Sequence, residues 1–213
     1  MKKKAAIFVV LVACLSVAGD ASARKRWDFG LKGGLNVAGL YGSDADTIGT
    51  DNRTGVIVGA FVTMKLNPGV GIRLEGHYAQ KGAKRALPEG ELTAKIDYID
   101  VPLLVVFQRE MTEDTFWLNM HVGPVFSFKV NAGGEVSAGG TYAGRDIDGI
   151  TKNFDYGGAV GIGGAWNAGR FDVVIDARYT VSFVSIDDTG EDLDFRNNAF
   201  SALAGVAVPL GYR

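Results

Sequence analysis

The stretch Arg170 to Ser185, RFDVVIDARYTVSFVS, decides the fold of this chain. Its odd positions from Phe171 to Phe183 carry apolar side chains, whereas its even positions carry mainly charged and hydroxyl side chains. Successive side chains of an extended strand point to opposite faces, so this alternation predicts a β-strand with one apolar face. Two environments fit such a strand: a soluble sheet whose apolar face covers a core, and a membrane barrel whose apolar face meets lipid.

The beginning of the chain has the pattern of an export signal. A basic start precedes an apolar run from Ala5 to Gly19, and small residues at 21–23 form a cleavage site. This pattern predicts a secretory signal peptide over residues 1–23, followed by a single domain over 24–213. A lipoprotein cleavage box that ends at Cys14 is the alternative. An uncleaved anchor is disfavoured because the run is shorter than the roughly 20 residues of a membrane-spanning helix.

Composition excludes several kinds of chemistry. Cys14 is the only cysteine, so the mature chain has no disulfide, no thiolate nucleophile and no cysteine metal site. The leader takes three lysines and one aspartate from totals of 22 basic and 24 acidic residues, and the remaining acidic excess makes nucleic acid a poor partner. The glycine-rich stretches GLKGG and GGAVGIGG are followed by neither a helix nor a Lys-Ser/Thr pair. We therefore expect no cofactor.

Runs with a period of two recur along the whole mature chain, and we expect eight strands from them. Pro102 cannot donate to a strand ladder, so a bulge or a local break is expected there. The expected strands cover residues 27–37, 55–66, 70–82, 98–107, 116–130, 154–166, 170–185 and 199–212.

The connections between these strands alternate in length. Three of them, 67–69, 109–115 and 167–169, are short. The others are long, polar loops, and they cover residues 38–54, 82–94, 131–153 and 185–198. Short turns at one end and long loops at the other are typical of an outer-membrane barrel, with the turns in the periplasm and the loops outside the cell.

The spacing of aromatic residues favours the membrane over a soluble core. Phe171 and Phe183 bound one apolar face, and Phe154 and Trp166 bound another, twelve positions apart in both cases. Twelve steps of about 3.3 Å, tilted by about 40°, span on the order of 30 Å, which matches an apolar membrane band with its aromatic girdles. We therefore predict an all-β fold, an eight-stranded antiparallel up-and-down transmembrane β-barrel in the outer membrane, with the charged faces inward.

Eight strands leave an interior that side chains just fill, so we expect a closed lumen rather than a diffusion pore. Charges of both signs on the inward faces would form a packed network. Glycines 157, 161 and 163 would make room for long arginines opposite them, and Arg170 would also point inward. The expected lumen charge network consists of Lys32, Arg73, Glu75, Asp100, Lys129, Asp172, Asp176 and Arg178.

With the strands laid out, the chain resembles the PorT-like outer membrane β-barrel group, often labelled porin family proteins. The matching stretches are FGLKGGLNVAGL, IRLEGHYAQKG, YIDVPLLVVF, HVGPVFSF, DYGGAVGIGGAW and VVIDARYTVSF, in that order. The resemblance implies a single small barrel in the outer membrane of a Gram-negative bacterium, in a group without a common catalytic site. The chain departs from the group in ending on Arg213, where such strands usually close on an aromatic residue; Tyr212 is the candidate substitute.

Two sets of residues are candidates for chemistry. His77 and His121 both fall on inward faces, but no serine stands in a nucleophile motif near them, so we interpret them as lumen histidines and the protein as not an enzyme. An acidic stretch has oxygen ligands that could hold calcium, but it lacks EF-hand spacing, and a solvated loop tip is the simpler interpretation. Its acidic residues are Asp187, Asp188, Glu191, Asp192 and Asp194.

Three classes of function follow. The leading one is a structural or surface-interaction barrel that acts through its long extracellular loops, as a monomer with outer-membrane lipid and lipopolysaccharide around it. The barrel-assembly machinery would insert it, and an extracellular protein is a possible ligand of the loops. The alternative is a narrow channel or an accessory of an outer-membrane transport or secretion system, and an enzyme embedded in the barrel comes last.

Overall fold

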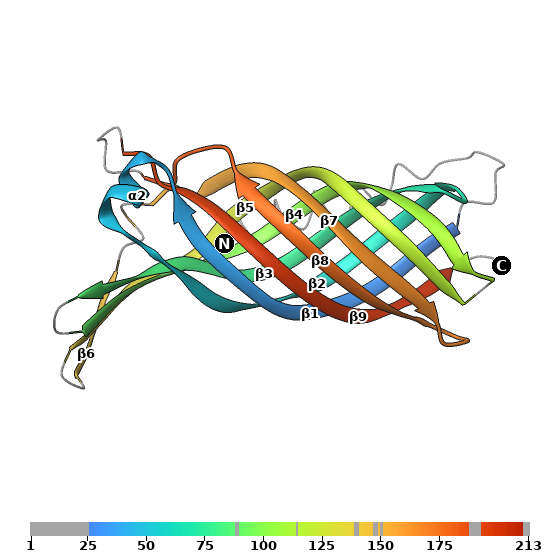
Figure 1. Cartoon of the computed structure of the whole chain (residues 1–213), viewed down its shortest axis with the longest axis horizontal. Coiled ribbons are helices and arrows are strands. Elements are labelled where there is room, and N and C mark those ends of the chain that lie inside the picture. The colour runs from blue at the N-terminus through green and yellow to red at the C-terminus, as the bar shows by residue number, and fades with distance from the viewer. Residues whose placement is uncertain are drawn as a thin grey trace, which may run out of the picture.

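Eight long antiparallel strands close into a barrel (Figure 1). The computed structural model of the chain describes residues 26–87, 90–113, 115–138, 141–146, 149, 151–187 and 193–210. The strands of the barrel are β1 (Arg26–Tyr41), β2 (Asp51–Asn67), β3 (Val70–Leu87), β4 (Gly90–Thr112), β5 (Phe116–Ala138), β7 (Phe154–Asn167), β8 (Asp172–Ser182) and β9 (Arg196–Leu210). Each pairs with its neighbours in that order, and β9 pairs with β1. The predicted eight-stranded barrel is therefore confirmed. The expected signal peptide, Cys14 and Tyr212 lie outside the described residues.

A ninth strand, β6 (Thr141–Asp146), lies outside the ring and pairs with residues 133–138 of β5. In Figure 1 it projects beyond one end of the barrel, beside the ends of β3 and β4. A short helix, α2 (Ser43–Ile48), lies at the same end, in the connection between β1 and β2. No helix within the described part of the chain has the length and apolar character needed to cross a membrane.

Two of the connections that the sequence predicts as loops are largely strand. The prediction for 82–94 is wrong because β3 and β4 stay paired as far as Leu87 and Gly90. The prediction for 131–153 is wrong because β5 continues to Ala138 and β6 pairs back onto it. In both segments, polar residues and glycines occupy the two faces of the sheet alike, so the period of two that identifies a half-buried strand is missing.

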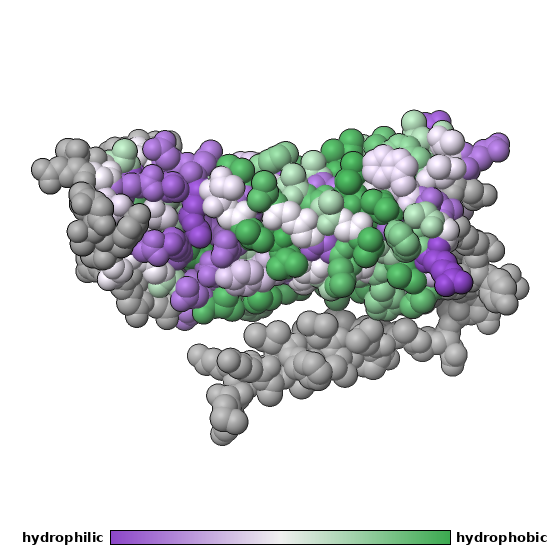
Figure 2. Space-filling view, turned by 90° about the horizontal axis from the view of Figure 1, so that it is seen from below, coloured by the Kyte–Doolittle hydropathy of each residue, from purple (hydrophilic) through white to green (hydrophobic). Residues whose placement is uncertain are grey.

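The two faces of the barrel wall have opposite character. Leu31 points outward and is 64% exposed, whereas the next residue, Lys32, points inward and is 4% exposed. The same alternation runs along the other strands and places large apolar side chains on the outside. Figure 2 shows these hydrophobic residues over the middle of one face, with hydrophilic residues toward the ends. Such an exterior requires lipid around it, and the predicted direction of the charged faces is confirmed.

The short connections lie together at the end of the barrel opposite to β6 (Figure 1). Only two residues separate β2 from β3, and β4 and β5 are joined through residues 113–115. The pairing of β3 with β4 is interrupted opposite Pro102, between Leu74 and His77 of β3, and it resumes in the same register. The expected local break is present, without a bulge.

Candidate functional site

Five charged side chains from three strands meet inside the barrel. Glu75 and Arg73 come from β3, Lys32 comes from β1, and Asp176 and Arg178 come from β8. We call these five residues the charged layer. They meet because each occupies an inward position of its strand, and because closure of the ring brings β1, β3 and β8 around one lumen.

Glu75 is the centre of the charged layer, and its side chain is fully buried. Its Oε1 accepts hydrogen bonds from Lys32 Nζ at 2.9 Å and from Arg178 Nη2 at 3.0 Å, and its Oε2 accepts one from Arg178 Nη1 at 2.6 Å. Arg178 therefore holds the carboxylate in the bidentate geometry of strong charge-assisted pairs. Ions removed from water need this degree of compensation, because an unpaired buried charge is very costly.

Asp176, on β8, binds the same two cations as Glu75. Its Oδ2 accepts hydrogen bonds from Lys32 Nζ at 3.0 Å and from Arg178 Nη2 at 3.2 Å. The fifth member, Arg73, differs from the others, because its Nη1 lies 3.9 Å from the nearest oxygens of Glu75 and Asp176. The two carboxylates are thus shared by Lys32 and Arg178, which cross-link three strands through the centre of the barrel.

The two histidines flank the charged layer. His77 Nε2 lies 3.5 Å from Glu75 Oε2, and His121 Nε2 lies 3.6 Å from Asp176 Oδ1. Both rings are buried, and neither Nε2 atom has a hydrogen-bond partner among the described residues. Within the same part of the chain, neither ring hydrogen bonds to a serine or threonine hydroxyl, so neither is paired with a hydroxyl nucleophile there.

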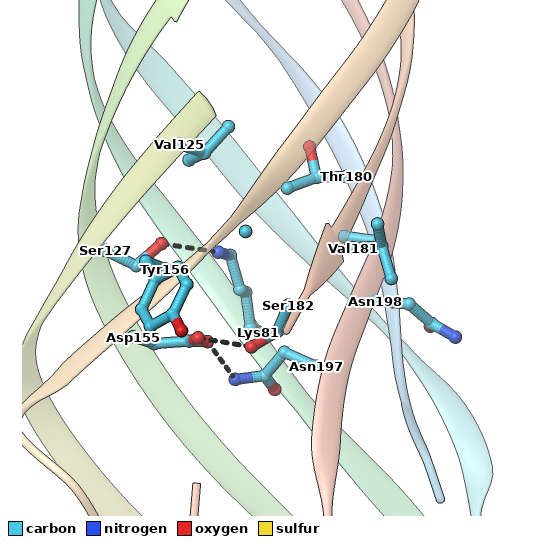
Figure 3. A pocket seen from close by; sticks show the side chains of 12 residues that line it. Lys81, Val125, Ser127, Asp155, Tyr156, Thr180, Val181, Ser182, Asn197 and Asn198 are labelled. Carbon is cyan, nitrogen blue, oxygen red and sulfur yellow. Dashed lines mark hydrogen bonds between the residues drawn. The ribbon is translucent and has the colours of Figure 1, made fainter. Parts of the chain in front are cut away.

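A second polar group fills the lumen between the charged layer and the end that carries β6. Lys81 Nζ donates to Asp100 Oδ1 at 2.9 Å and to Ser127 at 3.4 Å, and it lies 4.9 Å from the centre of the Tyr98 ring. Beside it, Asp155 accepts hydrogen bonds from Ser182 and Asn197 (Figure 3). A cavity of about 10 Å³ lies among these described residues, and it has the size of one water molecule.

Apolar side chains cover this polar group on the side toward the β6 end of the barrel. Tyr98, Ile96, Ala132 and Ile186 form a buried cluster, against which Leu40 and Phe195 pack. Tyr98 bridges the two environments, because its hydroxyl accepts a hydrogen bond from Asn197 at 3.2 Å while its ring is fully buried. From the charged layer to the end that carries β6, the lumen is therefore filled by two successive polar zones and closed by this apolar cluster, which we call the apolar lid.

The comparison with known families decides the class of the protein. The model of the outer membrane protein beta-barrel domain matches residues 18–188. The chain belongs to this family. It is a β-barrel of the outer membrane, and the charged layer lies within its membrane-spanning part.

Solved structures of other barrels are similar to this one. The attachment invasion locus protein Ail of Yersinia pestis is 18% identical, covers 84% of this chain and 97% of its own, and has a TM-score of 0.43. Neisserial surface protein A is 14% identical, with 84% and 96% covered and a TM-score of 0.45. The N-terminal barrel of Pseudomonas aeruginosa OprF is 8% identical, with 86% and 97% covered and a TM-score of 0.41. No curated protein sequence matches the chain.

The charge network expected from the sequence is divided among several places in this outer-membrane barrel. Lys32, Arg73, Glu75, Asp176 and Arg178 form the charged layer, and Asp100 lies in the second polar group. Lys129 lies nearer the β6 end, where its Nζ donates to the backbone oxygen of Thr151 at 2.5 Å. Asp172 is buried at the opposite end, at the start of β8.

Two details of the expected lumen are wrong. Arg170 does not point into the barrel, because β8 begins at Asp172 and Arg170 is an exposed residue of the preceding turn. Gly161 does not make room for an arginine: a Cβ atom there would lie 2.3 Å from Nε2 of His121. The missing side chain of Gly161 is what allows the His121 ring to lie this close to β7.

Only two of the acidic loop residues, Asp187 and Asp194, are described, and residues 188, 191 and 192 lie outside. Asp194 Oδ1 accepts a hydrogen bond from Arg196 Nε at 2.7 Å, and the backbone N–H of Asp194 donates to Asp44 at 2.7 Å. Within the described residues, no cluster of three or more carboxylate or histidine side chains could hold a metal ion.

Proposed function

We propose that the protein is a closed outer-membrane barrel with a structural or surface-interaction role, carried by the elements that project at its extracellular end. The end with short turns is periplasmic by the rule for bacterial barrels, so β6 and α2 lie outside the cell. The observation that carries the proposal is the contrast between a lumen blocked by buried charges and strands that continue far beyond the membrane.

The strands β4 and β5 are each 23 residues long, whereas about 9–11 residues of a tilted strand cross a membrane. Their outer parts pair with each other, with the end of β3 and with β6. We call this region the projecting sheet; it comprises residues 82–87, 90–97, 131–138 and 141–146. Figure 1 shows it as the extension that carries β6 away from the barrel.

The surface of the projecting sheet suits a macromolecular partner. Ion pairs join its strands across one face, between Lys84 and Glu91 at 2.9 Å and between Lys95 and Glu135 at 2.5 Å. On the other face, Leu92 and Val136 are opposite each other and only partly buried. The exposed Arg85 is in register with Leu92 and lies on the same face. A sheet that presents ion pairs on one face, and a cation beside two apolar side chains on the other, can recognise an extracellular protein, which is the partner we favour.

The other expectations take their place behind this one. A conducting channel would need an opening through the charged layer and the apolar lid, so it is the second candidate function. We rank an accessory role in transport, and membership of the PorT-like group, with it. That the protein is not an enzyme stays a prediction. We expect lipopolysaccharide around the barrel and the barrel-assembly machinery as its assembly partner.

Labelling on intact cells tests which end faces outward. A cysteine at Arg85, exposed on the projecting sheet, should react with a membrane-impermeant maleimide. A cysteine at Arg109, exposed at the end of β4 beside the short turns, should react only after the cells are opened, because the outer membrane shields it. Labelling of Arg109→Cys but not Arg85→Cys on intact cells would show that the orientation is inverted.

A trimmed variant tests the role of the projecting sheet. Residues 83–94 and 132–146 would each be replaced by a short turn, and heat-modifiable gel mobility would verify that the barrel still folds. We expect cells that display the full chain to adhere better to surfaces coated with serum or matrix proteins than cells that display the trimmed variant. Equal adherence on every coating would contradict the proposed surface role.

A further inference from the structure

The periplasmic half of the lumen contains a large cavity, of about 790 Å³, between the short turns and the charged layer. Pockets of about 300–1,000 Å³ are the usual size for small-molecule sites. The space exists because the strands on one side present small inward residues, among them Ala165 of β7 and Ala207 of β9. The turn residues Asn67 and Pro68 lie at its mouth.

Arg73 lines this cavity and is the least neutralised charge of the layer. Its Nε donates to Thr63 Oγ1 at 2.9 Å, which fixes the guanidinium, but among the described residues neither Nη atom makes a hydrogen bond. The 3.9 Å separations from Glu75 and Asp176 exceed hydrogen-bond distance. Since Lys32 and Arg178 already occupy the two carboxylates, the layer has three cations for two anions.

The acidic side chains elsewhere on the cavity wall do not neutralise Arg73. At the mouth, Asp28 is paired with Lys65 at 2.8 Å. Asp172 and Glu110, also on the wall, take part in other interactions. Arg109 also lines the cavity, but it is exposed to solvent. Arg73 is therefore the largely buried cation that an incoming anion would meet with donors still available, and ionic hydrogen bonds are strong where the groups are shielded from bulk water.

Aromatic side chains complete the site. The Phe61 ring lies under the Arg73 guanidinium, 4.9 Å from it, and holds it in place from one side. Trp117 of β5 also lines the cavity, together with apolar residues such as Val174 and Leu210. We propose that this cavity binds a small organic oxyanion from the periplasm, with its carboxylate or phosphate group on Arg73 and an apolar body against the aromatic wall.

Trp117 provides the readout. Of the three tryptophans, Trp166 faces lipid, and replacing it and Trp27 by phenylalanine leaves Trp117 as the only one in the chain. In this background we expect benzoate to change the fluorescence of the refolded protein saturably, and neutral benzamide to bind far more weakly. Arg73→Gln should weaken benzoate binding roughly tenfold or more. Lys65→Gln, which removes a paired cation at the mouth, should change it by about threefold at most.

The competing outcomes are distinguishable. Equal binding of benzamide and benzoate, or unchanged binding in Arg73→Gln, would overturn the assignment of Arg73. Inorganic phosphate that competes as well as benzoate would overturn the role of the apolar wall and leave a site for the bare oxyanion. If Arg73→Gln does not refold, iodide and caesium quenching of Trp117 in the tryptophan background decides: we expect iodide to quench more strongly, and equal quenching would contradict the anion site.

Discussion

Replacing Glu75 with glutamine is expected to lower the free energy of unfolding by about 3–5 kcal/mol. The side chain keeps its shape but loses its charge, so Lys32 and Arg178 remain buried with only Asp176 to share. Breaking a buried ion pair by removing one partner is costly because the other charge stays out of water. The measurement is the fraction of folded protein against urea, read from heat-modifiable gel mobility in detergent.

Two further variants make this result specific. Glu135→Ala breaks the exposed pair with Lys95 and should cost at most about 1 kcal/mol, since surface ion pairs contribute little. Adding Arg178→Met to Glu75→Gln restores the original charge balance of the layer and should recover much of the lost stability, because the two positions are in contact and couple. A double variant no more stable than the single one would refute the coupling between Glu75 and Arg178.

A charge placed on the lipid face should have the second largest effect. Val160, near the middle of β7, is 53% exposed on the outside of the barrel. Val160→Arg should destabilise the barrel by about 2–4 kcal/mol, because the guanidinium would lie at the depth of the bilayer midplane. Urea unfolding in lipid vesicles measures the change, since detergent would not reproduce the bilayer.

Val130 provides the matched control for this prediction. It is 54% exposed, on the same outer surface, but it lies beside the lumen residue Lys129 toward the β6 end of β5. Val130→Arg should therefore cost only about 0–1 kcal/mol, as expected near the interface. Equal costs at the two positions would mean that the outside of the barrel does not face a membrane.

The sequence predicts the barrel well because one physical signal runs through it. The alternation from Phe171 to Phe183 identifies a two-faced strand, and the aromatic spacing and the unequal connections identify the membrane. Where the strands extend beyond the membrane, as in 82–94, polar residues and glycines occupy both faces of the sheet, and this signal disappears. The projecting sheet could therefore not be predicted, although β4 and β5, the two longest described strands, form most of it.

The lumen was predictable in composition but not in pairing. Which inward residue meets which depends on the stagger of the strands, and period-two patterns do not give it. Lys32 and Asp176, 144 positions apart, are joined by closure of the barrel. Lys81 is missing from the expected network, although its side chain points inward and donates to Asp100 of the neighbouring strand. Its position in the alternation of inward and outward residues was the signal that could have included it.

The most direct test of the closed outer-membrane barrel is single-channel recording on the refolded mature protein in a planar bilayer, with heat-modifiable mobility measured on the same sample. A band that shifts on boiling, together with no stepwise current, is the predicted result, because the charged layer and the apolar lid block the lumen. Steady single-channel currents from a folded sample would contradict the closed lumen, and a band that does not shift would contradict the barrel itself.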